Sequence, residues 1–190
     1  YMATFGVVIS CIIGFTVGTL CFQNKNSASF MLGVCDIFQT FPSFVYLIPV
    51  MMLFGITDTS VLIAVIVYAT IPATRYTIEG LRSVPAALHD AATMSGVTKF
   101  QRLFKIEFPL AFPHMMLGLN QTIVFALFMV IIGAFIGTED LGQYILKALS
   151  DKKGAGIGLT LGLCVAFIGL IFDHLIRTWV GKRKKHLGIG

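Results

Sequence analysis

Apolar residues form long runs along the chain, and short polar stretches interrupt them. Five runs contain no Asp, Glu, Lys or Arg, and they cover residues 1–24, 37–57, 59–74, 108–138 and 154–172. A membrane-spanning helix needs about 20 predominantly apolar residues, with a range of roughly 17 to 25. The run 59–74 is the shortest, and it reaches this length if Arg75 extends its side chain to the membrane interface. The pattern therefore predicts five transmembrane helices.

The composition supports a membrane location. Hydrophobic residues make up 56% of the 190 residues and charged residues 12%, whereas about 25% of a typical soluble domain is charged. So few charged side chains cannot cover a surface in water, which disfavours a soluble helical bundle. We expect an all-α membrane protein in contact with lipid. The chain begins at Tyr1 without the features of a signal peptide, so we expect an N-terminally truncated fragment of a longer chain.

Basic residues are distributed unevenly between the loops. If the five helices cross the membrane alternately, one side receives every Lys and Arg except Lys147, Lys152 and Lys153. Because short cytoplasmic loops carry an excess of Lys and Arg, this side is predicted to be the cytoplasm, with residues 179–190 as a basic tail. The net charge of +5 follows from this topology, so no nucleic-acid partner is expected.

The largest polar interruption covers residues 83–109, SVPAALHDAATMSGVTKFQRLFKIEFP. Pro85 suits the first turn of a helix, where its missing N–H has no partner to lose. Gly96 suits the left-handed residue that follows the end of a helix. These signals predict a short helix over 85–96, held away from the bilayer, with small Ala side chains on its outer face.

A second helix is predicted directly after the first. Thr98 and Gln101 have the spacing of a capping box. Apolar residues then recur at helical spacing, so this helix is expected to lie along the membrane surface. Pro109 would open the next membrane helix.

The polar stretch also carries a motif. The pattern D-A-A-x3-G-x9-I-x-F-P is formed by Asp90, Ala91, Ala92, Gly96, Ile106, Phe108 and Pro109. It resembles the EAA motif, E-A-A-x3-G-x9-I-x-L-P, of bacterial ABC importer permeases of the MetI-like superfamily, with Asp for Glu and Phe for Leu. The resemblance implies a type I importer permease core in which helix 85–96 is a cytoplasmic coupling helix.

The same resemblance implies roles for the motif residues. Asp90, Ala91 and Ala92 are candidates for contact with the ATPase, and plain exposure on the helix is the alternative for Asp90. Gly96, Ile106 and Pro109 complete the ATPase-coupling set, and Gly96 is expected to be a backbone requirement rather than a contact.

Three further segments narrow the resemblance. QTFPSFVYLIPVMMLFGI at 39–56, NQT at 120–122 and IG…DLGQ at 136–143 are similar to the glycine betaine/proline (quaternary-amine) importer permeases. One departure is Thr138-Glu139-Asp140, where that family usually has small residues and Gly. This loop is either neutral surface variation or an adaptation to a particular binding protein.

The resemblance implies the permease subunit of an ATP-driven importer of compatible solutes such as glycine betaine, proline betaine or choline. The implied location is the bacterial inner membrane, with the C-terminus in the cytoplasm. The implied partners are cytoplasmic ABC ATPase subunits, an extracytoplasmic solute-binding protein and a second permease copy, as a homodimer. The chain itself would hold no catalytic residue and no cofactor, because the partner subunit hydrolyses ATP.

Polar residues within the apolar runs are candidates for the translocation path. Gln39 and Thr40 are expected at the start of the second membrane helix, and Asn120 and Gln121 near the centre of the fourth. Hydrogen bonds between helices are the alternative explanation for these side chains.

A secondary transporter driven by an ion gradient is the alternative function. It would need an intramembrane carboxylate or cation site and an inverted repeat. All acidic residues lie outside the charge-free runs, with Asp36 and Asp173 expected at the cytoplasmic ends of their runs, and no repeat is evident. The scattered Cys and His residues lack the spacing of metal ligands, so no metal site is predicted.

Overall fold

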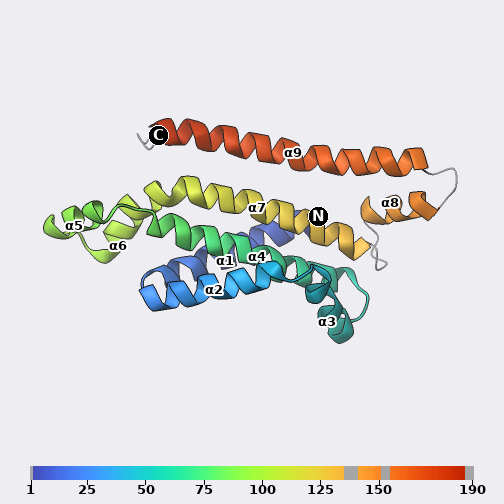
Figure 1. Cartoon of the computed structure of the whole chain (residues 1–190), viewed down its shortest axis with the longest axis horizontal. Helices are drawn as coiled ribbons and strands as arrows, with labels where there is room; N and C mark the ends of the chain where they lie inside the picture. Colours follow the sequence, from blue (N-terminus) through green and yellow to red (C-terminus); the bar gives the residue numbers. More distant parts are fainter. Residues whose placement is uncertain (1, 135–140, 151–154, 187–190) are drawn as a thin grey trace.

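The computed structural model describes residues 2–134, 141–150 and 155–186, and nearly all of them are helical (Figure 1). The elements are α1 (Met2–Phe22), α2 (Lys25–Thr40), α3 (Phe44–Phe54), α4 (Asp58–Arg82), α5 (Ala86–Met94), α6 (Lys99–Arg102), the π-helical turn η1 (Leu103–Glu107), α7 (Phe108–Ala134), α8 (Leu141–Ser150) and α9 (Ala155–His186). No strand occurs among the described residues, which confirms the all-α prediction. Glu139 and Asp140, where the sequence departs from the family pattern, lie outside the described residues.

Four helical segments are long and apolar enough to cross a membrane. They are α1, α4, the run Lys99–Ala134 and the part Gly156–Lys182 of α9. Together α2 and α3 pass the same test, although they are bent by 87° relative to one another. The five predicted spans are therefore found if this bent pair counts as one span.

The predicted second membrane helix is not straight. α2 ends at Thr40 and α3 begins at Phe44, so the apolar run 37–57 is divided at Pro42. Proline disfavours helical backbone at the residue before it, and Phe41 is extended, with φ −73° and ψ 134°. The apolar run is therefore a broken span, as a proline within a helix predicts.

α2 begins well before the apolar run. Its first residue is Lys25, and the side chain of Asn24 caps it by accepting a hydrogen bond from the N–H of Asn26. Gln39 and Thr40 consequently lie at the end of a helix, not at the start of one as predicted. They still lie beside the break in the span.

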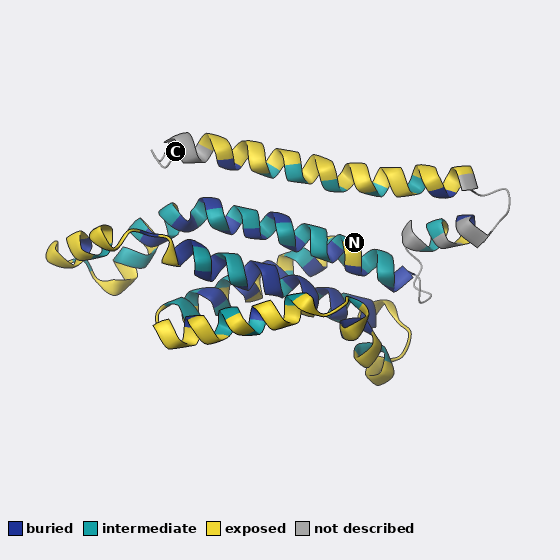
Figure 2. Ribbon diagram, in the orientation of Figure 1, coloured by how far each residue is buried: buried dark blue, intermediate teal, exposed yellow. Residues whose placement is uncertain are grey.

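α4 is the central helix and is buried along most of its length against α1 and α7 (Figure 2). Glycines allow this close approach. A Cβ atom on Gly14 of α1 would lie 2.4 Å from Cβ of Ala73, and one on Gly118 of α7 would lie 2.7 Å from Cβ of Tyr76. In lipid, helices associate through such close packing, since the hydrophobic effect does not drive them together.

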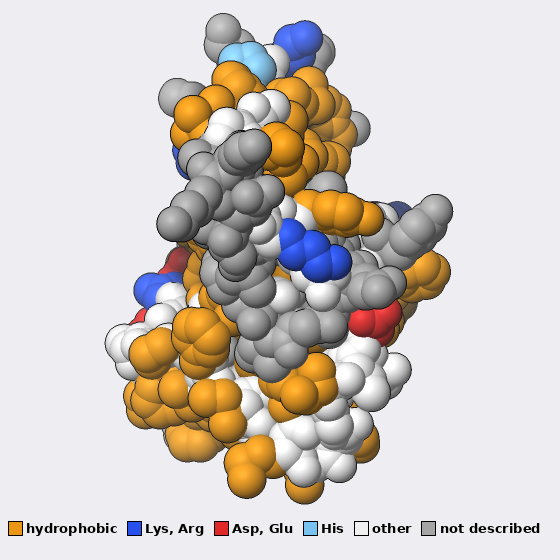
Figure 3. All heavy atoms as spheres, turned by 90° about the vertical axis from the view of Figure 1, so that its right-hand side faces the viewer, with side chains coloured by type: hydrophobic (Ala, Val, Ile, Leu, Met, Phe, Trp, Pro, Cys, Tyr) orange, Lys and Arg blue, Asp and Glu red, His pale blue; other side chains and the backbone are white. Residues whose placement is uncertain are grey.

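Large hydrophobic side chains cover much of the surface. On the end viewed in Figure 3 they gather at the level of α9 and again at the level of α3, where Met52 and Leu53 are 83% and 78% exposed. α9 is exposed along most of its length (Figure 2). Such a surface suits lipid or a partner chain rather than water.

Segments predicted to share one side of the membrane lie at one end of the molecule. Arg82 Nη2 donates to the carbonyl oxygen of Lys25 at 2.9 Å, which joins the end of α4 to the start of α2. The C-terminal end of α9 lies at the same end as α5, opposite α3 and α8 (Figure 1). The tail predicted over 179–190 is helical as far as His186, and 187–190 lie outside the described residues.

Candidate functional site

α5 is a short helix whose end is set by the local sequence. Gly96 follows it with φ +70°, a conformation that favours glycine. The N–H of Gly96 donates to the carbonyl of Thr93 at 3.1 Å. The N–H of Val97 donates to the carbonyl of Ala92 at 3.2 Å. These two bonds form a Schellman motif, so the predicted helix and its glycine cap are both present.

The predicted capping box is also present, but the helix it begins is not a separate one. Thr98 Oγ1 accepts from the N–H of Gln101 at 3.3 Å, and Gln101 Oε1 accepts from the N–H of Thr98 at 3.1 Å. α6, η1 and α7 then form one continuous run, Lys99–Ala134. The π turn η1 lies just before Pro109, whose missing N–H interrupts α-helical bonding. The expectation of a distinct surface helix is therefore wrong.

Glu107 joins α5 to the start of α7. This side chain is 2% exposed, and its Oε1 accepts a hydrogen bond from Nε of Arg102 at 2.9 Å. The same oxygen lies 3.1 Å from Nδ1 of His89 on α5. A buried carboxylate needs such partners, because an unpaired buried charge is costly. Glu107 thus provides a direct polar connection between α5 and the start of α7.

The EAA-like residues divide between two sides of α5. Asp90 and Ala91 are exposed, whereas Ala92 is 4% exposed and lies on the inner side of the helix. The expectation that both alanines face outward is therefore wrong for Ala92, which lies one turn after Leu88. A groove of about 500 Å³ separates α5 from the start of α7, and it is lined by Leu88, Ala91, Ala92, Ser95, Val97, Lys105, Ile106, Pro109 and Leu110. Four residues of the motif thus share one groove.

Two of the four predicted path residues share a polar cavity. Gln39 of α2 and Gln121 of α7 both line a cavity of about 290 Å³. Its other lining residues are Pro72, Arg75, Tyr76, Glu79 and Phe125. The cavity therefore lies where the broken span meets α4 and α7, and it combines amide, charged and aromatic groups.

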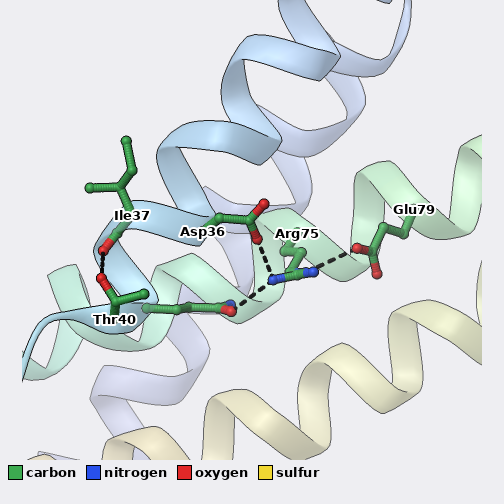
Figure 4. Close-up of polar contacts among 6 residues, drawn as sticks. Asp36, Ile37, Thr40, Arg75 and Glu79 are labelled. Carbon is green, nitrogen blue, oxygen red and sulfur yellow. Dashed lines mark hydrogen bonds and ion pairs between the residues drawn. The ribbon is translucent and has the colours of Figure 1, made fainter.

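Arg75, which lines this cavity, is the centre of a charged cluster. Its Nη1 donates to Oδ1 of Asp36 at 2.5 Å and to Oε1 of Gln39 at 2.9 Å. Its Nε donates to Oε1 of Glu79 at 2.9 Å. Figure 4 shows the guanidinium between Asp36 of α2 and Glu79 of its own helix. The sequence did not predict this cluster, since Arg75 was assigned to the membrane interface and Asp36 to a cytoplasmic helix end.

Arg75 and Glu79 of the cluster lie inside a candidate membrane span. Arg75 precedes the end of α4 at Arg82 by two turns, roughly 10 Å along the helix axis. Ionisable residues inside membrane spans are rare, face a protein interior or a water-filled cavity, and mark solute or ion pathways. The cluster therefore qualifies as part of a candidate path.

The other two predicted path residues lie elsewhere. Thr40 is exposed, and its Oγ1 donates to the carbonyl of Ile37 at 2.7 Å (Figure 4). Asn120 is buried, and its Nδ2 donates to Oδ1 of Asp173 on α9 at 2.5 Å. For Asn120 the alternative explanation, a hydrogen bond between helices, is therefore correct. Asp173 lies within α9, bonds to Asn120 near the centre of α7 and pairs with Arg177.

The site offers no evident place for a metal ion. No group of three or more His, Cys, Asp or Glu side chains within the described residues could hold one. The chemistry available in this part of the chain is thus hydrogen bonding, ion pairing and aromatic contact.

The fold is that of an ABC importer permease. The chain is similar to a chain of the MetNI methionine ABC transporter, solved in inward-facing conformations, with TM-scores of 0.81 and 0.77 in two crystal forms. The alignment covers 96% of this chain and 91% of that chain, at 19% and 20% identity. This likeness, with the continuous run into α7 and the EAA-like motif, defines a membrane domain of the MetI type.

The chain belongs to the family described as binding-protein-dependent transport system inner membrane component, which matches residues 6–186. Membership confirms the resemblance to MetI-like permeases and identifies a transport component rather than an enzyme. It does not favour a secondary transporter. Asp36, Glu79 and Asp173 nevertheless lie within helices of candidate spans.

Several named transport permeases are similar to this chain in sequence. The chain is 93% identical over its whole length to the trimethylamine N-oxide transport system permease protein TmoV of Pelagibacter ubique, and 45% identical to that of Ruegeria pomeroyi. It is 33% identical to the glycine betaine transport system permease protein OpuAB of Bacillus subtilis. The chain spans 26% and 29% of the length of the first two relatives and 63% of the third.

Proposed function

We propose that this chain is the translocating part of an ATP-driven importer of small methylated amines, with trimethylamine N-oxide as the first candidate solute. The name of the 93% identical relative supports this solute. The names of relatives at 33% and 34% identity support glycine betaine as a second member of the class. Both solutes combine a methylated, positively charged nitrogen with an oxygen that carries negative charge.

The proposed partners are cytoplasmic ATPase subunits, an extracytoplasmic solute-binding protein and a second permease copy. The family description, which names binding-protein-dependent transport, supports the binding protein. The clustering of basic residues at the end that carries α5 supports a cytoplasmic position for that end. The C-terminal end of α9 would then also be cytoplasmic.

The contact of Glu107 with His89 and Arg102 is the observation that carries the coupling mechanism. Asp90 and Ala91 on the exposed side of α5 are proposed to contact the ATPase. Ala92, Ile106 and Pro109 would keep α5 against the start of α7, and Gly96 would fix its end. ATP can favour one state of the permease over another only if α5 takes different positions in the two states. Glu107 would transmit that difference to α7.

The proposed path passes the cavity that contains Gln39 and Gln121. Arg75 offers hydrogen-bond donors to the oxygen of the solute, while the carboxylates of Asp36 and Glu79 attract its positively charged nitrogen. Tyr76 and Phe125 line the same cavity, and aromatic faces attract methylated ammonium groups. The cavity thus presents a complement to each end of a dipolar solute.

The test is uptake of labelled trimethylamine N-oxide by liposomes that contain the complete permease, its ATPase and its binding protein. We expect uptake only with ATP, and competition by an excess of unlabelled glycine betaine. Uptake driven by a proton or sodium gradient without ATP would overturn the importer mechanism. ATP-dependent uptake of glycine betaine without any of trimethylamine N-oxide would overturn the choice of solute alone.

A further inference from the structure

A second cavity lies beside α5, and it shares no lining residue with the cavity of the proposed path. It has a volume of about 600 Å³ and is lined by Phe22, Gln23, Lys25, Leu81, Arg82, Val84, Ala86, His89, Lys99, Phe100, Arg102, Leu103 and Glu107. These residues come from the turn between α1 and α2, the end of α4, α5, and the start of the run into α7. The cavity therefore lies where the short helix α5 meets the ends of the membrane helices.

The lining is strongly basic. Four Lys and Arg side chains and one His face a single carboxylate. That carboxylate, Glu107, is already paired with Arg102 and lies against His89. The ammonium groups of Lys25 and Lys99 have no hydrogen bond or ion pair with any described residue. An excess of positive charge is therefore left without a partner in a concave site.

The lining is also apolar on one side. Leu81 is fully buried and Val84 nearly so, while Phe100 is 70% exposed. Phe22 and Arg82 are the last residues of α1 and α4, so the cavity lies at the level where these helices leave the membrane. A site that joins apolar walls to unpaired ammonium groups at this level suits an amphiphilic anion rather than a free one.

We propose that this cavity binds the headgroup phosphate of an anionic phospholipid from the leaflet at this end of the molecule. Basic pockets between membrane helices at this interface recognise such headgroups. Lys25 from the start of α2 and Lys99 from the start of α6 both line the cavity and supply the ammonium groups for the phosphate. The bound lipid thereby connects α5 to the ends of α1 and α4, while Glu107 connects α5 to α7. This site does not depend on the identity of the transported solute.

The proposal is tested by binding of phosphatidylglycerol and phosphatidylcholine to the complete purified permease, measured by native mass spectrometry. The variant Lys25→Gln/Lys99→Gln removes both free ammonium groups. The control Lys105→Gln/Lys147→Gln removes the same charge from outside the cavity. We expect the wild type and the control to prefer phosphatidylglycerol, and the first variant to bind it about 30-fold more weakly, as loss of two interfacial lysines predicts.

Equal phosphatidylglycerol binding by the two double variants would overturn the site. Displacement of the lipid by millimolar inorganic phosphate would show a site for a free anion and overturn the lipid assignment. Unchanged lipid binding by the first variant, together with loss of the ATPase subunit when the whole transporter is purified, would identify a protein contact instead. Restoration of binding by Lys25→Arg/Lys99→Arg separates a loss of charge from a failure to fold.

Discussion

Arg75 of α4 donates a hydrogen bond over 2.5 Å to Asp36 of α2, and this ion pair joins the broken span to the central helix. Glu79 holds the other side of the same guanidinium. Replacement of Arg75 leaves two carboxylates without their cation beside the cavity. Transport and solute selection are both expected to depend on this cluster.

Arg75→Gln is expected to lower trimethylamine N-oxide uptake about tenfold, equivalent to about 1.4 kcal/mol. The effect on thermal stability is expected to be small, because Arg75 and Asp36 are partly exposed and such pairs contribute little. Arg177→Gln, which breaks an ion pair within α9, is the control for uptake in the same liposomes. A loss of uptake as large in the control would contradict a special role for Arg75.

Glu107→Gln is expected to uncouple ATP hydrolysis from transport. The variant weakens the contacts of residue 107 with His89 and Arg102, so a movement of α5 is no longer transmitted to α7. Uptake per ATP hydrolysed should fall about tenfold, within the 1–3 kcal/mol (about 5- to 150-fold) typical of coupling between sites. Asp58→Asn serves as the control, because Asp58 is the first residue of α4, at the end of that helix far from Glu107. A Glu107→Gln variant with normal uptake per ATP would remove this contact from the coupling mechanism.

Gly14→Ala is expected to destabilise the membrane domain by about 1–3 kcal/mol, the usual effect of overpacking. The added Cβ would lie 2.4 Å from Cβ of Ala73 and 2.9 Å from the backbone N of Thr74. Gly33→Ala is the matched control, because nothing lies within 4 Å of a Cβ at that position. Thermal unfolding in detergent should show a lower Tm only for Gly14→Ala. Equal Tm values for the two variants would contradict the close contact of α1 with α4.

Gln121→Ala is expected to raise the apparent KM for uptake about fivefold, the equivalent of about one hydrogen bond of 1 kcal/mol. Gln121 lines the polar cavity, whereas the hydroxyl of Thr40 bonds to its own helix. Thr40→Val should therefore leave the KM unchanged. The reverse order of effects would place the path on the other side of α2.

Local signals predicted the coupling region well. Pro85 and Gly96 delimit α5, and Thr98 with Gln101 caps α6, because each signal acts within a few residues of the chain. Pro42 was an available signal for the break between α2 and α3. A proline inside a helix breaks or kinks it.

Contacts between distant segments were not predictable in this way. The pairs Asp36–Arg75 and His89–Glu107 depend on how α2, α4, α5 and α7 pack, which no periodicity of a single segment encodes. Charge-free runs also placed Asp173 at a membrane boundary, although α9 continues on both sides of it. Helices that extend beyond their apolar runs carry charged residues into the membrane domain when those residues find partners.

The most direct test of coupling through α5 measures uptake and ATP hydrolysis together for wild type, Gly96→Asn and Gly96→Pro in the complete transporter. Proline cannot adopt the φ of +70° at this position and removes the N–H that bonds to Thr93, whereas asparagine tolerates the left-handed conformation. We expect Gly96→Asn to keep most of the uptake and Gly96→Pro to abolish it while the complex still assembles. Normal ATP-driven uptake by Gly96→Pro would contradict the role of α5 in coupling.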